Sequence, residues 1–241
     1  MKSLKKSIKS LCNGVLISIK MLIRTRSLRE VINAQFSDAN KVVVGLGVID
    51  YVVTKNGDKF SMSKLIDTVV QAQKSYIFDD IRKDEIVIYI GASIGGFAIP
   101  ASTKAKVVYA VEPLTPDLLK VNVALNNSKN IQVLDVALGD GKKRELKWFD
   151  RNSIVQTKTL TEIKSLCGGC GFLKIDCEGA EWDIREDELK GIRRIEMEVH
   201  NVGFPLSLME NRLKGAGFKY SVVKQSGGGI GLWLIHASRL V

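Results

Sequence analysis

The stretch IVIYIGASIGGF at residues 86–97 decides the fold, because an apolar run of strand length leads into a turn rich in glycine. Glycine is favoured where the backbone comes close to a ligand or to another segment. A helix that begins after such a turn offers free N–H groups to an anion. The turn lacks the G-x-G-x-x-G spacing of a dinucleotide site and the Lys-Ser/Thr ending of a P-loop. It therefore leaves two interpretations, a ligand-binding turn and close packing of a helix on a strand.

Further apolar runs alternate with helical segments along the chain. They lie at residues 85–90, 106–111, 131–136, 172–175 and 195–199. Continuous apolar strands separated by helices predict a parallel sheet that helices cover on both faces. The last two runs, 218–223 and 232–236, flank a glycine-rich turn at 226–231 and must pair antiparallel.

Composition and charge narrow the class of protein. The chain has 241 residues, of which 45% are hydrophobic and 26% charged, which excludes a disordered or fibrous protein. The net charge is +10, but residues 1–30 hold eight basic residues and one acidic residue, so the other 211 residues carry only +3. This distribution gives no support to a nucleic-acid surface on the body.

The basic N-terminal segment has the apolar periodicity of an amphipathic helix. Its least charged run, residues 11–19, is too short to span a bilayer. Two interpretations stay open: residues 1–26 lie on an anionic membrane surface, or the helix packs on the body. We expect three parts: a basic helical arm at 1–39, a hairpin and helix lead-in at 40–82, and a ligand-binding domain at 83–241. The expected location is cytoplasmic, with peripheral contact at the inner face of the membrane as the alternative.

Polar side chains follow the predicted strands at their carboxyl ends, where ligands bind in open α/β sheets. Glu112, with Pro113 after it, follows the second strand and could accept hydrogen bonds from both ribose hydroxyls of a nucleoside. A solvated loop glutamate is the alternative.

A second acidic group and a histidine follow later strands. Asp176, Glu178 and Glu181 crowd one strand end, where burial and like charge would raise a pKa toward general-base use. Acidic residues of a helix start are the alternative. His200 ends the next strand, as a base or as a structural histidine. The candidate catalytic residues are therefore Asp176, Glu178, Glu181 and His200. The single Cys167–Cys170 pair is a poor zinc set, so we expect no metal site.

In this order, the motifs resemble the FkbM-type family of S-adenosylmethionine-dependent methyltransferases. The resemblance covers about residues 40–236, and its most specific part is Lys-Ile-Asp-Cys-Glu-Gly-Ala-Glu at 174–181. It also rests on residues 90–95, 112–113, 126–127, 136–140 and 198–200. It implies an α/β fold of the class I methyltransferase, Rossmann-like type. Such a fold has a seven-stranded, mostly parallel sheet with helices on both faces and an antiparallel last strand, here with an N-terminal helical and hairpin extension.

The resemblance further implies S-adenosyl-L-methionine as cofactor and O-methylation of a hydroxyl on a sugar, glycan or other small molecule. An RNA methyltransferase, or a non-catalytic membrane-associated module of the same fold, is the alternative. The residues expected at the cofactor are Gly91, Ala92, Ser93 and Gly95 at the methionine portion, Glu112 and Pro113 at the ribose, Asp135, Ala137 and Leu138 at the adenine, and Asp176.

The chain departs from the family pattern in and before its turn. Tyr89 stands where the family has an Asp that supports the cofactor's methionine part, Ser93 replaces an Asn, and Gly96 replaces an aromatic residue. We expect Asp176 to take over the amino group of the cofactor. The residues alone do not decide which of the four catalytic candidates is the base.

Overall fold

The computed structural model describes residues 40–43, 51–54, 56–61, 63, 65–148, 150–225 and 231–239. The predicted amphipathic helix, with its membrane or packing role, lies outside these residues, as does most of the predicted glycine turn near the C-terminus. Among the described residues, no helix is long and apolar enough to cross a membrane.

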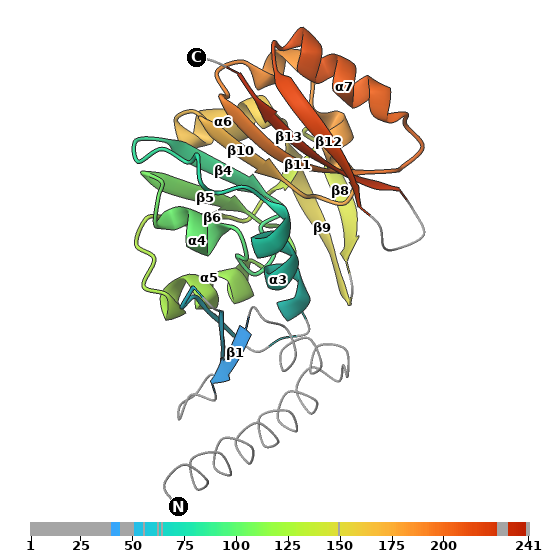
Figure 1. Ribbon diagram of the computed structural model, residues 1–241. Coiled ribbons are helices and arrows are strands. Elements are labelled where there is room, and N and C mark those ends of the chain that lie inside the picture. The colour runs from blue at the N-terminus through green and yellow to red at the C-terminus, as the bar shows by residue number, and fades with distance from the viewer. Residues whose placement is uncertain are drawn as a thin grey trace, which may run out of the picture.

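A seven-stranded sheet forms the centre of the molecule (Figure 1), in the order β12-β13-β11-β10-β4-β5-β6. Strands β4, β5, β6, β10 and β11 are parallel, whereas β13 runs antiparallel to both β11 and β12. The strands are β4 (Ile86–Ile90), β5 (Val107–Val111), β6 (Ile131–Leu134), β10 (Phe172–Ile175), β11 (Arg194–His200), β12 (Lys219–Gln225) and β13 (Leu232–Ser238). This arrangement confirms the class I methyltransferase Rossmann-like fold predicted from the sequence.

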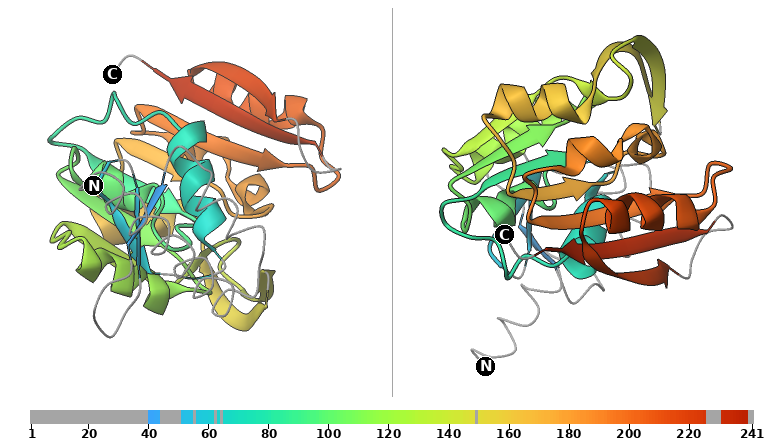
Figure 2. Two further views of the ribbon diagram at one scale, coloured as in Figure 1. Left: turned by 60° about the horizontal axis from the view of Figure 1, so that its bottom comes forward. Right: turned by 90° about the horizontal axis from the view of Figure 1, so that it is seen from above.

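Helices cover both faces of the sheet (Figure 2), as continuous apolar strands require. On one face, Val87 and Tyr89 of β4 share a core with α3 (Ile66–Ser75), α4 (Ala98–Ser102) and α5 (Pro116–Leu125). On the other face, Ile88 and Ile90 share a core with α6 (Leu160–Cys167), α7 (Leu206–Gly215) and two short 3₁₀ helices, η1 (Ala180–Asp183) and η2 (Glu186–Leu189).

The lead-in before the sheet joins the first of these cores. Its strands β1 (Asn40–Val43), β2 (Tyr51–Thr54) and β3 (Lys59–Ser61) form an antiparallel sheet, and β2 and β3 are the predicted hairpin. The Asn122 side chain of α5 accepts a hydrogen bond from the Ser61 N–H at 2.7 Å. Val52 and Phe60 are fully buried in the core that also holds Val87. The lead-in therefore packs as part of the same body.

A small third sheet was not predicted. It consists of β7 (Ala137–Leu138), β8 (Lys143–Trp148) and β9 (Arg151–Lys158), in the order β7-β9-β8. The β8–β9 hairpin is largely exposed and rich in charge, so it has no apolar run of strand length. Its β8 strand forms one wall of the cavity described next.

Candidate active site

A cavity of about 480 Å³ opens at the carboxyl ends of β4, β5 and β10. Its size lies in the range of about 300–1,000 Å³ that is usual for small-molecule sites. The strand order reverses here, because β5 lies on one side of β4 and β10 on the other. Eight of the residues expected at the site line this cavity: Gly91, Ser93, Glu112, Pro113, Ala137, Leu138, Asp176 and Glu178.

Five expected residues are not in the cavity wall. Ala92 and Gly95 belong to the turn but do not line the cavity, and Ala92 is fully buried. Asp135 is exposed to solvent, whereas its neighbour Val136 takes part in the wall. Glu181 and His200 lie behind the wall, where they bond to each other. The structure thus brings together the turn, the end of β5 and the end of β10.

Gly91 is required by the neighbouring strand. Its φ is +78°, and a Cβ there would lie 1.7 Å from the carbonyl oxygen of Asp176. A Cβ on Gly95, whose φ is +96°, would meet the Leu119 side chain at 2.9 Å. Ser93, between them, has a φ of +48°, which is uncommon for a residue with a side chain. Close packing therefore explains both glycines, and a role of the turn in ligand binding stays a prediction.

Glu112 holds this turn in place. Its carboxylate is buried and accepts hydrogen bonds from the backbone N–H groups of Ser93 at 2.7 Å, Leu114 at 2.7 Å and Thr115 at 2.9 Å. Burial raises the pKa of Glu112, and these three bonds oppose the rise. A carboxylate has about four acceptor positions, so a ligand hydroxyl would share the fourth with the Thr115 hydroxyl, which also lowers the pKa of Glu112.

A chain of polar groups forms the floor of the cavity. The Lys174 ammonium lies 3.0 Å from Oδ2 of Asp176. The Tyr76 hydroxyl, at the end of α3, lies 3.0 Å from the same oxygen and 2.8 Å from Oε2 of Glu198. Lys174 is fully buried and Glu198 is 3% exposed, whereas the Asp176 side chain is 26% exposed and reaches the cavity.

Charge decides how these carboxyl groups ionise. Burial would raise the pKa of Asp176, but the Lys174 ammonium and the Tyr76 hydroxyl lower it below its ordinary value. Burial and the negative charge of Asp176 raise the pKa of Glu198. Asp176 is therefore the ionised member of the pair, and Glu198 is the member that takes up a proton first.

Tyr89, the departure from the family pattern, faces Lys174 across the β4–β10 register. The Lys174 ammonium lies 4.9 Å from the centre of the Tyr89 ring and 3.7 Å from that of Tyr76. The rings of Tyr76 and Tyr89 and the carboxylate of Asp176 thus surround the buried Lys174 ammonium. An Asp at position 89 would place a second carboxylate beside this ammonium.

His200 is bound to Glu181 behind the cavity. Both its backbone N–H, at 2.7 Å, and its Nδ1, at 3.0 Å, contact Oε1 of the fully buried Glu181. Burial lowers the pKa of His200, but the bond to Glu181 and the charges of Glu181, Glu178 and Asp176 raise it to about 9. The imidazole is therefore cationic at neutral pH, whereas a general base must be neutral before it takes up a proton.

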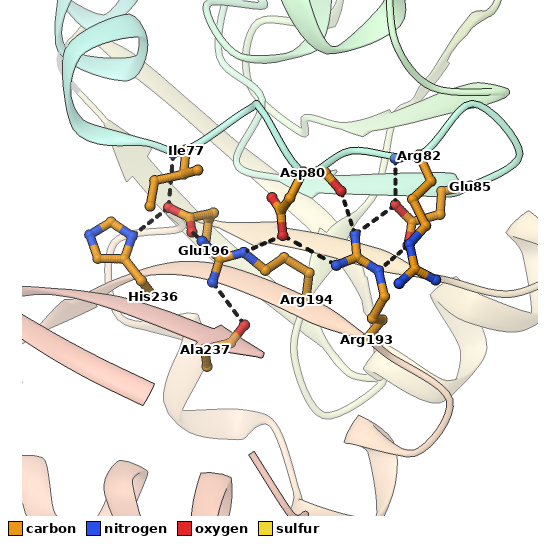
Figure 3. A network of polar contacts seen from close by, with 9 residues as sticks. All are labelled: Ile77, Asp80, Arg82, Glu85, Arg193, Arg194, Glu196, His236 and Ala237. Atoms are coloured by element: carbon orange, nitrogen blue, oxygen red, sulfur yellow. Dashed lines mark hydrogen bonds and ion pairs between the residues drawn. The ribbon is translucent and has the colours of Figure 1, made fainter. Parts of the chain in front are cut away.

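A clamp of ion pairs holds the segment that delivers Tyr76 (Figure 3). Glu196 accepts a hydrogen bond from the Ile77 N–H at 3.1 Å and contacts His236 at 2.7 Å and Arg194. Arg194 and Arg193 both reach Asp80, and Arg193 also pairs with Glu85 at 2.6 Å. The clamp fixes residues 77–85 on the sheet, and this places the Tyr76 hydroxyl between the two carboxyls. The sequence gives no signal for this contact.

Aromatic side chains form part of the cavity lining. Trp148 comes from β8, and its indole N–H donates to Glu178 at 3.1 Å. Trp182 of η1 packs on Phe204, with ring centres 5.2 Å apart, and Phe204 is 49% exposed. None of these three aromatic residues was predicted from the sequence. Together they give the cavity an aromatic lining beside the Glu178 carboxylate.

Two other groupings of side chains have the residue types of a metal or redox site. Asp176, Glu198 and His200 have potential ligand atoms within 4.8 Å of one another. Lys174 already neutralises Asp176, however, and His200 is bound to Glu181. The charges of these side chains are therefore balanced within the protein, and the group is a poor site for a metal ion. Cys167 and Cys170 are free and buried, and burial raises the pKa of Cys167 to about 12. Neither thiol is poised for redox or metal chemistry.

Comparisons with known proteins found likeness of structure alone. No family model and no curated protein matches the chain. A precorrin-6y C5,15-methyltransferase from Geobacter metallireducens matches with 14% identity over 70% of this chain and 87% of that one, at a TM-score of 0.44. An rRNA methylase from Streptococcus thermophilus matches with 8% identity over 73% and 95%, at 0.47. M. jannaschii TYW2, solved in complex with AdoMet, matches with 17% identity over 83% and 90%, at 0.49. Likeness at this level carries no argument about substrate, and the fold rests on the strand order above.

Proposed function

We propose that the chain is an S-adenosylmethionine-dependent methyltransferase that methylates a hydroxyl on a sugar, glycan or other small molecule. The observation that carries the proposal is the cavity at the switch point of the sheet, with Glu112 at the end of one strand and Asp176 at the end of another. The sequence resemblance to the FkbM-type family supports the same activity.

The residues present fit this cofactor. When bound, it supplies a methyl group on a positively charged sulfur, and it also carries an ammonium group. The carboxyls of Asp176 and Glu198 in the wall match this positive charge. Among the described residues, both contacts of Asp176 fall on Oδ2, which leaves Oδ1 to accept from the ammonium group. Val136, Ala137 and Leu138 give an apolar place for the adenine.

The protein's own part in the reaction is alignment and exclusion of water. Glu112 would accept a ribose hydroxyl at its fourth acceptor position, beside the Thr115 hydroxyl, and fix the cofactor against the turn. Trp148, Trp182 and Phe204 would hold the apolar face of the acceptor, and Glu178 beside Trp148 would accept one of its hydroxyls. Because a sulfonium methyl is already activated, orientation can supply much of the rate enhancement.

Two measurements, made one after the other, test the proposal. Calorimetry with S-adenosylmethionine and S-adenosylhomocysteine separates a cofactor-binding protein from a module that merely keeps the fold. Transfer of a labelled methyl group onto glycans, lipids or RNA then identifies the acceptor. Binding followed by label in the glycan or small-molecule fraction is the expected result. Label in RNA would establish the alternative enzyme, and absence of cofactor binding by folded protein would refute the proposal.

A further inference from the structure

One phenol hydroxyl lies between two carboxyl groups in the cavity floor. Tyr76 has a single hydroxyl proton, yet its oxygen is 3.0 Å from Oδ2 of Asp176 and 2.8 Å from Oε2 of Glu198. With both carboxyls ionised, the phenol can donate to one of them only. With Glu198 protonated, Glu198 donates to the phenol oxygen and the phenol donates to Asp176, so both contacts become hydrogen bonds. The geometry therefore favours a proton shared along this chain.

The groups around Glu198 determine which carboxyl holds that proton. The groups that face it are Tyr76 from the end of α3, Lys174 of β10, Asp176 just after β10, Tyr89 of β4, and His200 from its own strand. On the neighbouring strand β13, the residue paired with Glu198 is Leu234, which carries no charge. Lys174 contacts Asp176 directly, at 3.0 Å, and neutralises it. Among the described residues, the ion-pair partner of Glu198 is the more distant His200, whose Nε2 is 3.9 Å from Oε1. Glu198 is also the more deeply buried carboxyl, so it holds the proton.

We propose that Glu198 is the catalytic base of this chain, with Tyr76 and Asp176 as the residues that position its proton. The proposal rests on the proposed function. In the free protein Glu198 carries a proton, and the positive charge that the cofactor brings into the cavity drives that proton off. As the acceptor oxygen then forms its bond to the methyl carbon, the carbon–sulfur bond breaks with its electron pair on sulfur. The hydroxyl proton passes to the Glu198 carboxylate.

His200, the base candidate expected from the sequence, is less suited to the role. It is cationic at neutral pH, and its Nδ1 is engaged by Glu181 at 3.0 Å. It also lies outside the cavity wall, whereas Glu198 is part of that wall. A base needs a vacant lone pair within reach of the proton it removes, and an ionised Glu198, which lines the cavity and contacts Tyr76 through Oε2, would offer one on Oε1.

The test compares two ligands that differ by one methyl group and one positive charge. The affinities of the full-length protein for S-adenosylmethionine and S-adenosylhomocysteine are measured by calorimetry between pH 5 and 8. In the wild type, the ratio of the two affinities should rise with pH, by up to about tenfold per pH unit, because only the sulfonium drives a proton from Glu198. Glu198→Gln should make the ratio independent of pH, while binding of S-adenosylhomocysteine shows that the variant is folded.

His200→Gln is the matched control, and it should keep the rise in the affinity ratio but move it to higher pH, because the loss of the imidazolium charge raises the pKa of Glu198. A rise that disappears in His200→Gln, or persists in Glu198→Gln, overturns the assignment of Glu198, as does a flat ratio in the wild type. A wild type that binds neither ligand refutes the proposed function instead. With an acceptor from the labelling screen, Glu198→Gln should lower kcat by about 10²–10⁴-fold at saturating S-adenosylmethionine, in addition to the weaker binding of S-adenosylmethionine that the flat ratio predicts.

Discussion

The Tyr76 hydroxyl lies 2.8 Å from Glu198, a residue 122 positions away along the chain. This contact joins the end of α3 to the end of β11 and closes the floor of the cavity. The contact is held in place because the Glu196 carboxylate accepts a hydrogen bond, at 3.1 Å, from the backbone N–H of Ile77, the residue after Tyr76. Glu196, two residues before Glu198 on the same strand, thus positions the Tyr76 hydroxyl at the Glu198 carboxyl.

Replacement of Tyr76 by Phe should destabilise the protein. It removes the hydroxyl that donates to Asp176 and accepts from Glu198, and a buried polar group without a partner costs about 1–3 kcal/mol. The free energy of unfolding, measured in denaturant, should fall by this amount. Tyr109→Phe is the control, because the Tyr109 hydroxyl makes no hydrogen bond within the described part of the chain. Equal stability of the two variants would contradict a shared-proton role for Tyr76.

Replacement of Gly91 by Ala should lower the free energy of unfolding by more than the strain of a positive φ alone explains. The new Cβ would lie 1.7 Å from the Asp176 carbonyl oxygen, so strands β4 and β10 would have to separate. We expect a loss of roughly 3 kcal/mol or more. Gly141→Ala is the matched control, since its φ is +85° and a Cβ there would meet no described atom within 4 Å. This control should cost only about 1–2 kcal/mol. Thermal or denaturant unfolding of both variants measures the difference.

Glu112→Ala should weaken binding of S-adenosylhomocysteine by roughly 10–100-fold, the effect of losing charge-assisted hydrogen bonds of ~1.5–3 kcal/mol. The loss has two sources, the ribose contact and the disordering of the turn, because Glu112 accepts from the Ser93, Leu114 and Thr115 N–H groups. Calorimetry measures the affinity, and unfolding of the unliganded variant measures the second source. Unchanged affinity in a folded variant would remove Glu112 from the site.

The strands could be predicted where burial on both faces produces a continuous apolar run. Residues 86–90 and 107–111 are such runs, and both are strands of the central sheet. The β8–β9 hairpin gave no such signal, because solvent reaches most of both strands and charged residues fill them. Its position against the cavity depends on tertiary contacts such as the 2.6 Å ion pair between Arg144 and Asp183.

The site could be predicted in part, because parallel strands bring their carboxyl ends to one edge of the sheet. A further signal was available in the strand period of two: Lys174 and Asp176 share a face, as do Glu196 and Glu198, and the β10–β11 register places Lys174 opposite Glu196. Tyr76 had no comparable signal. It arrives through a loop that ion pairs fix in place, and local periodicity does not determine loop geometry.

The stability of the protein should depend on pH through His200. Its pKa is raised to about 9 by Glu181 and the neighbouring carboxylates, against an ordinary value of ~6.5 in the unfolded chain. A raised folded-state pKa stabilises the fold fully below about pH 6.5, and this contribution is lost as the pH rises through about 9. The difference corresponds to about 3 kcal/mol. His200→Gln should therefore lower the free energy of unfolding at pH 6 and approach the wild type at pH 10. Arg151→Gln, which removes an exposed charge outside the cavity wall, should keep the wild-type slope. A wild-type slope in His200→Gln would show that the Glu181 contact does not hold the imidazole in its charged form.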